Sequence, residues 1–236
     1  MKIIHNLSFI FIFFITSTIT SQTYEVTYIE SKNIESKLKK IKDPLLKAKI
    51  KSQLKASGKF VLTAYNKQSL YEATEQMATA EVQNNIKVIS IRSKKSKVFK
   101  NLKSNTYLEE TSILEDEYLI SDVLPEIQWE LTNDRKKVGG YNCKKALGQF
   151  HGRSIEAWYT VEIPISDGPY IYQGLPGLIL ELHTPYKSFT TENIEIGSAP
   201  VKFQKLSIGK KVTRNDFAVV EKKKIKEMTL HATTKM

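Results

Sequence analysis

The stretch GPYIYQGLPGLI, residues 168–179, contains two prolines and three glycines within twelve positions. Each proline fixes its own φ and restricts the residue before it, whereas glycine allows turns at little steric cost. An apolar run, residues 178–180, follows at once. The stretch therefore predicts a rigid, tightly turned loop that feeds a buried strand. Two roles are open for it: a corner that only shapes the fold, or a loop whose apolar side chains line a ligand site.

On both sides of this loop, apolar and polar residues alternate as they do in half-buried strands. Strands are predicted at residues 22–30, 58–65, 69–74, 86–91, within 94–103, at 107–113, 118–121, 127–132, 141–150, 154–163, 178–183, 188–196 and 201–206. Asn133 and Asp134 predict a turn, residues 138–140 a bulge, and residues 151–153 a tight turn between two strands.

Two segments change to a helical period. In residues 33–56 apolar side chains recur every three or four positions, Asn33 is a suitable N-cap, and Pro44 predicts a break. A second helix is predicted at residues 213–228, opened by Asn215 and Asp216. The predicted fold is mainly β (α+β): a large curved antiparallel sheet or half-barrel with one helix after the first strand and one at the C-terminus. Residues 22–236 are expected to form a single domain, since no repeat or linker interrupts them.

The first 21 residues have the layout of a secretory signal peptide. Lys2 is followed by the apolar block LSFIFIFFI, residues 7–15, and then by small and polar residues up to Ser21. The block is too short for a spanning helix, which needs about 20 residues. We therefore predict cleavage after Ser21 and export to the periplasm or the extracellular space.

The chain is basic, with 36 Lys and Arg against 25 Asp and Glu and a formal net charge of +11. The lysines are spread along the sequence, and no Arg-rich arm, zinc-ligand spacing or aromatic RNA-binding motif accompanies them. We predict no nucleic-acid partner. The charge favours solvated faces, with peripheral contact to anionic lipid headgroups or polysaccharide as the alternative.

A set of short blocks resembles the central segment of the GLPGLI family. The blocks are WEL at 129–131, GYNCKKA at 140–146, FHGR at 150–153, AWYT at 157–160, IPI at 163–165, GP at 168–169 and GLPGLI at 174–179. This resemblance implies an exported protein of Bacteroidota-type bacteria with no established activity. The positions expected to have a structural role are Trp129, Tyr141, Cys143, Gly152, Gly168, Pro169, Gly174 and Gly177. The layout is also similar to that of lipoprotein-carrier-like half-barrels, which is an analogy of fold alone.

The sequence offers few reactive groups. Cys143, His151, His183 and Met77 are of the types that soft metals prefer. Cys143 and His151 are eight residues apart along one predicted strand, a distance of over about 20 Å, which is too far to share a metal or a proton. We predict no metal site, no cofactor and no catalytic residue, with Cys143 buried. An unrecognised hydrolase, in which His183 approaches Cys143 across the sheet, is the alternative.

The predicted function is therefore noncatalytic: a cell-envelope protein that binds an apolar or lipid-like ligand, or an envelope partner, on the concave face of the sheet under the helices. The predicted binding residues are Arg153, Trp158, Tyr170, Tyr172, Leu175 and Pro176. For Arg153 the competing expectation is an ion pair with Asp167, or a bond to a carbonyl, that pins the corner. The alternative function is that of an accessory interaction module of an outer-membrane transport system. The oligomeric state is not predicted.

Overall fold

The computed structural model describes residues 22–33, 43–45, 57–74 and 97–233. The predicted signal peptide at 1–21 and the predicted strand at 86–91 lie outside the described residues. So does most of the helix predicted at 33–56, of which Pro44 and Leu45 are described and are helical.

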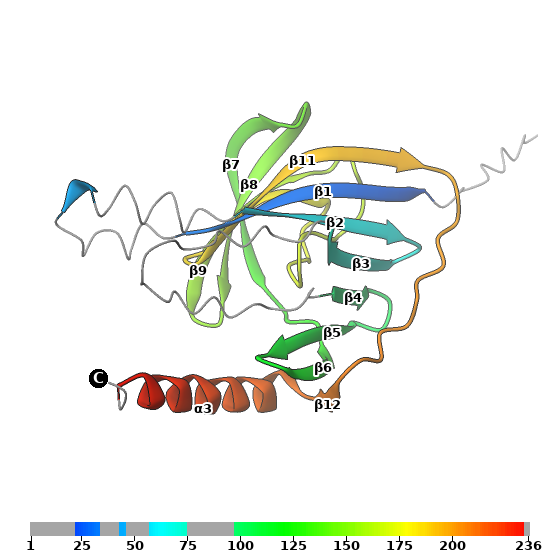
Figure 1. Cartoon of the computed structure of the whole chain (residues 1–236). Coiled ribbons are helices and arrows are strands. Elements are labelled where there is room, and N and C mark those ends of the chain that lie inside the picture. Colours follow the sequence, from blue (N-terminus) through cyan, green and yellow to red (C-terminus); the bar gives the residue numbers. More distant parts are fainter. Residues whose placement is uncertain (1–21, 34–42, 46–56, 75–96, 234–236) are drawn as a thin grey trace, which may run out of the picture.

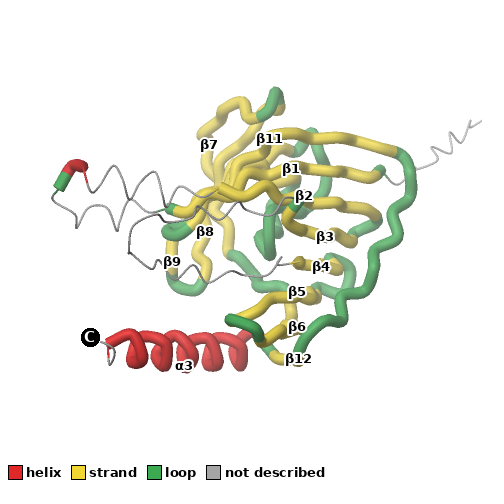
Figure 2. The backbone as a smooth tube through the Cα atoms, in the orientation of Figure 1, coloured by secondary structure: helices red, strands yellow, loops and turns green. Residues whose placement is uncertain are grey.

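The described chain forms a sheet of twelve strands followed by a helix (Figures 1 and 2). The elements are β1 (Thr23–Lys32), β2 (Ser57–Tyr65), β3 (Gln68–Ala73), β4 (Lys97–Asn101), β5 (Thr106–Ile113), β6 (Asp116–Val123), β7 (Gln128–Val138), β8 (Tyr141–Phe150), β9 (Arg153–Thr160), β10 (Leu178–His183), β11 (Lys187–Gly197), β12 (Lys210–Val212) and α3 (Arg214–Thr233). Their order across the sheet is β12-β6-β5-β4-β3-β2-β1-β11-β10-β9-β8-β7. Neighbours are antiparallel except β12 and β6. The predicted mainly β fold is confirmed.

The sheet is strongly curved. In the strand order β6 is second and β7 is last, so a flat sheet would separate them by about 48 Å at about 4.8 Å per strand. Residues 124–127 alone connect these two strands, and a connection of that length reaches about 18 Å at most. The two ends of the sheet therefore approach each other, as the predicted half-barrel requires.

The inside of the curve is filled by residues 161–177, which we call the corner loop. Its side chains Ile163 and Leu175 are each 1% exposed. They belong to the same buried cluster as Tyr28 and Tyr71, which the alternation of β1 and β3 directs inward. The Tyr28 hydroxyl donates a hydrogen bond of 2.6 Å to the carbonyl of Ile179, at the start of β10. The core is thus formed by the corner loop together with inward-facing side chains from both halves of the sheet.

The β7–β8 hairpin differs from its prediction. No turn forms at Asn133 and Asp134: β7 continues to Val138 with a register irregularity between Leu131 and Arg135. The chain turns instead at Gly139 and Gly140, whose φ values of 56° and 88° match the twist of a two-residue hairpin turn. The predicted turn at 151–153 is confirmed, with His151 and Gly152 at φ values of 49° and 72°.

The C-terminal part also departs from its prediction in two places. The strand predicted at 201–206 is wrong: this segment is irregular, and the edge beside β6 is taken by β12. Helix α3 forms as predicted, but its cap is Thr213, whose hydroxyl accepts from the backbone N–H of Asp216 at 3.1 Å. The helix contacts β6 at the edge of the sheet and buries Phe217 there (Figure 1).

Candidate functional site

A buried ion pair anchors the corner loop to the sheet. Lys100 of β4 is fully buried, Asp167 of the loop is 1% exposed, and the ammonium group contacts the carboxylate. Lys100 also donates to the carbonyl of Gly168 at 2.6 Å, while the backbone N–H of Gly168 donates to Asp167 at 2.7 Å. Burial lowers the pKa of Lys100, and the charge of Asp167 opposes that shift. Because both charges are desolvated, each depends on the other.

Two glycines of the corner loop occupy places where a side chain does not fit. A Cβ on Gly177 would lie 2.0 Å from the carbonyl oxygen of Thr160, and a Cβ on Gly168 would lie 2.8 Å from the side chain of Ile179. Both contacts are shorter than van der Waals contact allows. The loop therefore packs directly against the ends of β9 and β10 through bare backbone.

Trp129 packs against the same loop from β7, the last strand in the order of the sheet. Its indole N–H donates to the carbonyl of Gln173 at 3.0 Å. The ring lies over Gly148, where a Cβ would come within 2.8 Å of it, and beside Gly174, whose φ is 98°. Trp129, Gly148 and Gly174 thus form one packing unit.

A second polar cluster ties the loop to helix α3. The hydroxyl of Tyr170 donates to Glu109 of β5 at 2.9 Å, and the guanidinium of Arg214 contacts both groups, at 3.0 Å from Tyr170. Arg214 also donates to the hydroxyl of Tyr107 at 3.1 Å. Burial opposes the charge of Arg214, but Tyr170 and Glu109 outweigh it and raise its pKa. Tyr170 has a φ of 55°, a costly conformation for an aromatic residue, and this cluster holds it there.

The six predicted binding residues do not form one site, although the rings of Tyr170 and Tyr172 are neighbours with centroids 6.2 Å apart. Leu175 is buried in the core and Tyr172 is 8% exposed, packed between Phe150 and Phe189 with ring centroids 5.1 and 5.9 Å away. Pro176 is exposed on the loop, and Trp158 is half-buried on the face of β9 opposite to Ile155 and the core.

Arg153 makes a different contact from the expected one. It lies 5.0 Å from the ring of Tyr186, in a cation–π arrangement at the hairpin end. The expected ion pair of Arg153 with Asp167 is wrong, because Asp167 is buried and paired with Lys100. The sequence does not indicate the pairing of Lys100 with Asp167, because Lys100 is one of several lysines within residues 94–103.

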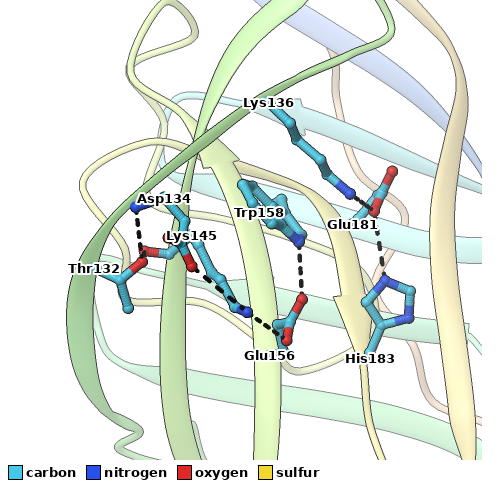
Figure 3. A network of polar contacts seen from close by, with 8 residues as sticks. All are labelled: Thr132, Asp134, Lys136, Lys145, Glu156, Trp158, Glu181 and His183. Atoms are coloured by element: carbon cyan, nitrogen blue, oxygen red, sulfur yellow. Dashed lines mark hydrogen bonds and ion pairs between the residues drawn. The ribbon is translucent and has the colours of Figure 1, made fainter.

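Trp158 is the centre of a polar network on the outer face of β7–β10 (Figure 3). We call this the outer network; it comprises Lys136, Lys145, Glu156, Trp158, Glu181 and His183. The ammonium groups of Lys136 and Lys145 lie 4.4 and 5.8 Å from the ring of Trp158. The indole N–H donates to Glu156 at 3.0 Å, and Lys145 pairs with Glu156 at 3.0 Å.

The carboxylates of the outer network are held by cations. Glu181 pairs with Lys136 and lies 3.4 Å from the ring nitrogen of His183. Burial acts to raise the pKa of Glu156, but the hydrogen bonds from Lys145 and Trp158 outweigh it and lower that pKa. The ring of Trp158 is therefore fixed in orientation by Glu156, which is itself held by Lys145.

A hollow of about 360 Å³ lies near the turn of the β7–β8 hairpin, against Val161 and Glu162 at the start of the corner loop, and Lys136 of the outer network is part of its lining. Its other lining residues are mostly cationic. The backbone N–H and side-chain amide of Asn142 both donate to Glu162, at 2.9 Å each. No polar pattern in the sequence had singled out this hollow, because it depends on the pairing of the two strands.

Cys143 lies in the same hairpin and is 1% exposed. Burial raises the pKa of its thiol to about 11, so the thiol is protonated at neutral pH. His183 lies beside Glu181, and within the described residues no three His, Cys, Asp or Glu side chains gather as metal ligands would. Met77 lies outside the described residues.

Residues 150–181 match the model of a family described as "Protein of unknown function (Porph_ging)". This segment contains β9, the corner loop and the start of β10. Within it, Gly177 packs against the end of β9, and Asp167 anchors the loop to β4. No curated protein matches the chain.

Solved structures of PNGF-II resemble the fold. The structure in space group P21 is 17% identical with a TM-score of 0.53, and the structure in space group C2 is 18% identical with a TM-score of 0.51. In both cases the match covers 84% of this chain and 32% of the other. The chain thus spans about a third of the length of PNGF-II. In the described part of the chain, no helix combines the length and the apolar character that a membrane span requires.

Proposed function

We propose that this chain is a noncatalytic binding module of the cell envelope, exported after removal of residues 1–21, and that it docks an envelope protein on the outer network around Trp158. The observation that carries the proposal is the state of Trp158. A large aromatic ring remains half-exposed on a strand face, although its polar neighbours are all ordered by contacts within the chain.

Such a ring is suited to protein recognition. Trp is among the residues that contribute most to interface affinity. Its contribution is largest where the side chain is already held in one conformation before binding, because little conformational entropy is then lost. Glu156 fixes the indole by a 3.0 Å hydrogen bond, and Lys136 and Lys145 flank the ring. The surface therefore presents one apolar ring surrounded by positively and negatively charged side chains. This arrangement favours a partner whose surface also carries charges of both signs.

The packing of the concave face supports a partner outside the curve. The corner loop fills that face in the described structure, with Ile163 and Leu175 buried and Asp167 paired to Lys100. A ligand on the concave face would have to displace this loop or bind beside it. The protonated thiol of Cys143 and the pairing of Glu156 and Glu181 with lysines support a noncatalytic role.

We also propose that the chain is a member of the GLPGLI family of exported Bacteroidota proteins. The string at 174–179 falls within the matched segment 150–181. Its residues are those that the packing of the corner loop makes hard to replace, Gly177 above all. The share of PNGF-II that the chain matches, about a third, suits a module that recurs within longer proteins.

An apolar or lipid-like ligand on the concave face is the second candidate. The observation in its favour is the aromatic lining, in which Phe150, Tyr172 and Phe189 are in contact and Tyr28 lies near Tyr71. Native mass spectrometry of protein purified from its own host tests it directly. A retained lipid-sized adduct supports this candidate, and a clean polypeptide mass counts against it.

The docking proposal is tested by photo-crosslinking in cells of the host. A photoreactive amino acid replaces Leu147, which is 40% exposed and lies opposite Glu156 on the outer face of β8. The matched control replaces Val219, which is 68% exposed on α3. We expect one dominant protein adduct from position 147 and none of the same mass from position 219.

Two variants decide whether the outer network makes the contact. Trp158→Ala should reduce the adduct at least about tenfold, the loss expected at an interface centre. The charge swap Lys145→Glu with Glu156→Lys keeps an ion pair within the chain but exchanges the positions of the positive and negative charges beside Trp158. It should also reduce the adduct. Equal adducts from positions 147 and 219, or an adduct that survives both variants, would contradict the proposal.

A further inference from the structure

The pairing of β7 with β8 collects cations on one face of their hairpin. Arg135 is directly opposite Lys144, and Lys137 is directly opposite Asn142. Since directly opposite residues share a face and residues two apart along a strand share it too, all four side chains lie on the same side. We call these four residues the basic cradle.

The cations of the cradle are unpaired, unlike those on the other face of the same hairpin. Lys136 pairs with Glu181 and Lys145 with Glu156. Within the described part of the chain, Arg135, Lys137 and Lys144 make no ion pair. Three neighbouring cations that form no ion pair repel one another, so an anion placed between them is stabilised.

The cradle borders the hollow of about 360 Å³ at the start of the corner loop. This volume is at the lower end of the range for small-molecule sites, about 300–1,000 Å³. The one carboxylate in the lining, Glu162, already accepts two hydrogen bonds from Asn142. Those bonds hold Glu162 in place. Lys136, which also lines the hollow, is paired with Glu181, so Arg135, Lys137 and Lys144 are the cations that can meet a ligand.

We propose that the basic cradle is a binding site for a phosphate group, either of a soluble phosphomonoester or of a phospholipid headgroup. Arg135 supplies a planar fork that fits two phosphate oxygens, and Lys137 and Lys144 supply point charges on either side. The two-residue turn at Gly139 and Gly140 fixes the hairpin, so the cations are arranged before the ligand arrives.

The cations of this site are distinct from the outer network, although Lys136 of that network also lines the hollow. The cradle and Trp158 lie on opposite faces, because Lys144 is paired with Tyr159, the neighbour of Trp158 on β9. A variant of the cradle therefore leaves the contacts of Trp158 in place, and a loss of phosphate binding is distinguishable from a loss of the protein partner.

The test measures the binding of the full chain to inorganic phosphate and to glycerol phosphate by calorimetry, and its flotation with phosphatidylcholine vesicles with and without phosphatidylglycerol. The variant Arg135→Gln with Lys144→Gln should weaken phosphate-dependent binding by roughly tenfold or more. Lys222→Gln with Lys223→Gln on exposed α3 removes the same charge and should change binding less than about twofold.

The two arms identify the source of the phosphate. Binding of soluble phosphate without flotation indicates a soluble ligand, and flotation that glycerol phosphate competes away indicates a headgroup; either outcome supports the site if the cradle variant abolishes it. Equal losses of binding in the cradle and α3 variants would show that binding depends only on the net charge of the chain, and would overturn the proposal. Absence of both phosphate binding and flotation would overturn it as well.

Discussion

The ion pair Lys100–Asp167 in the core and the pair Lys145–Glu156 in the outer network use the same two chemical groups in opposite surroundings. In the core the side chains are 0% and 1% exposed, whereas on the outer face they are 22% and 35% exposed. Burial lowers the pKa of Lys100, with Asp167 opposing the shift, while the hydrogen bond to Glu156 raises the pKa of Lys145.

This difference shows that desolvation, and not the partner, decides what each pair contributes. A buried pair gains little over an apolar contact but is costly to break, because one charge is then left without water or partner. A solvated pair can lose either member at small cost. The core pair therefore fixes the position of the corner loop, whereas the outer pair contributes little to the fold.

The largest effect is expected from Gly177→Ala, which tests how rigidly the corner loop is held. The added Cβ would lie 2.0 Å from the carbonyl oxygen of Thr160, and neither backbone can move without disturbing β9 and β10. We expect a loss of more than about 4 kcal/mol in the free energy of unfolding, measured by urea denaturation.

Gly152→Ala is the matched control for that variant. Gly152 has a φ of 72°, but nothing lies within 4 Å of an added Cβ, so only backbone strain opposes the change. The expected cost is about 1 kcal/mol. Equal losses in the two variants would mean that the corner loop is no more tightly packed than an exposed turn.

The second effect is that of breaking the core ion pair. Lys100→Met leaves Asp167 charged and buried, with an expected cost of about 3–5 kcal/mol. Adding Asp167→Asn removes the stranded charge and keeps an acceptor for the backbone N–H of Gly168. The double variant should therefore recover much of the stability in urea denaturation. A double variant less stable than Lys100→Met would contradict this account of desolvation.

The same contrast explains which parts of the molecule the sequence could predict. Strands such as β1 follow from alternation, because Tyr24, Val26 and Tyr28 fall on one face and are all buried. The corner loop follows from its prolines and glycines. Both signals are local, since they depend on the geometry of neighbouring residues.

The polar contacts of the core could not be predicted in this way. Lys100 is 67 residues from Asp167, and Arg214 is 105 residues from Glu109. A lysine within a basic segment resembles an exposed one until the sheet order places it inside the curve. The basic cradle was missed for the same reason, because its face is defined only when Arg135 is paired with Lys144.

The third effect concerns Cys143 and depends on pH. The pKa of its thiol is raised to about 11 in the folded chain and is near its ordinary value of 9 in the unfolded chain. Between these values the folded state holds more protons, so stability falls as the pH rises. From pH 8 to pH 10 this thiol should account for a loss of about 1 kcal/mol.

Cys143→Ala isolates that contribution. Its stability should fall less steeply than that of the natural chain between pH 8 and pH 10, whatever its stability at neutral pH. Above pH 10 the tyrosines with raised pKa values, such as Tyr172 at about 12, also contribute, so the comparison stops there. Parallel curves for the two proteins would indicate that the thiol is solvated.

The smallest effect is expected from the outer pair, where Glu156→Gln with Lys145→Gln removes both charges. Both side chains are partly exposed, so water replaces the lost pairing, and the urea midpoint should shift too little to resolve. Salt at about 0.5 M should reduce any remaining difference in stability between this variant and the natural chain, because it screens the pair. Photo-crosslinking from position 147 should nevertheless weaken in this variant, because two of the charged groups that surround Trp158 have been removed. A loss of stability comparable to that of Lys100→Met would show that the outer network, like the core pair, serves the fold and not a partner.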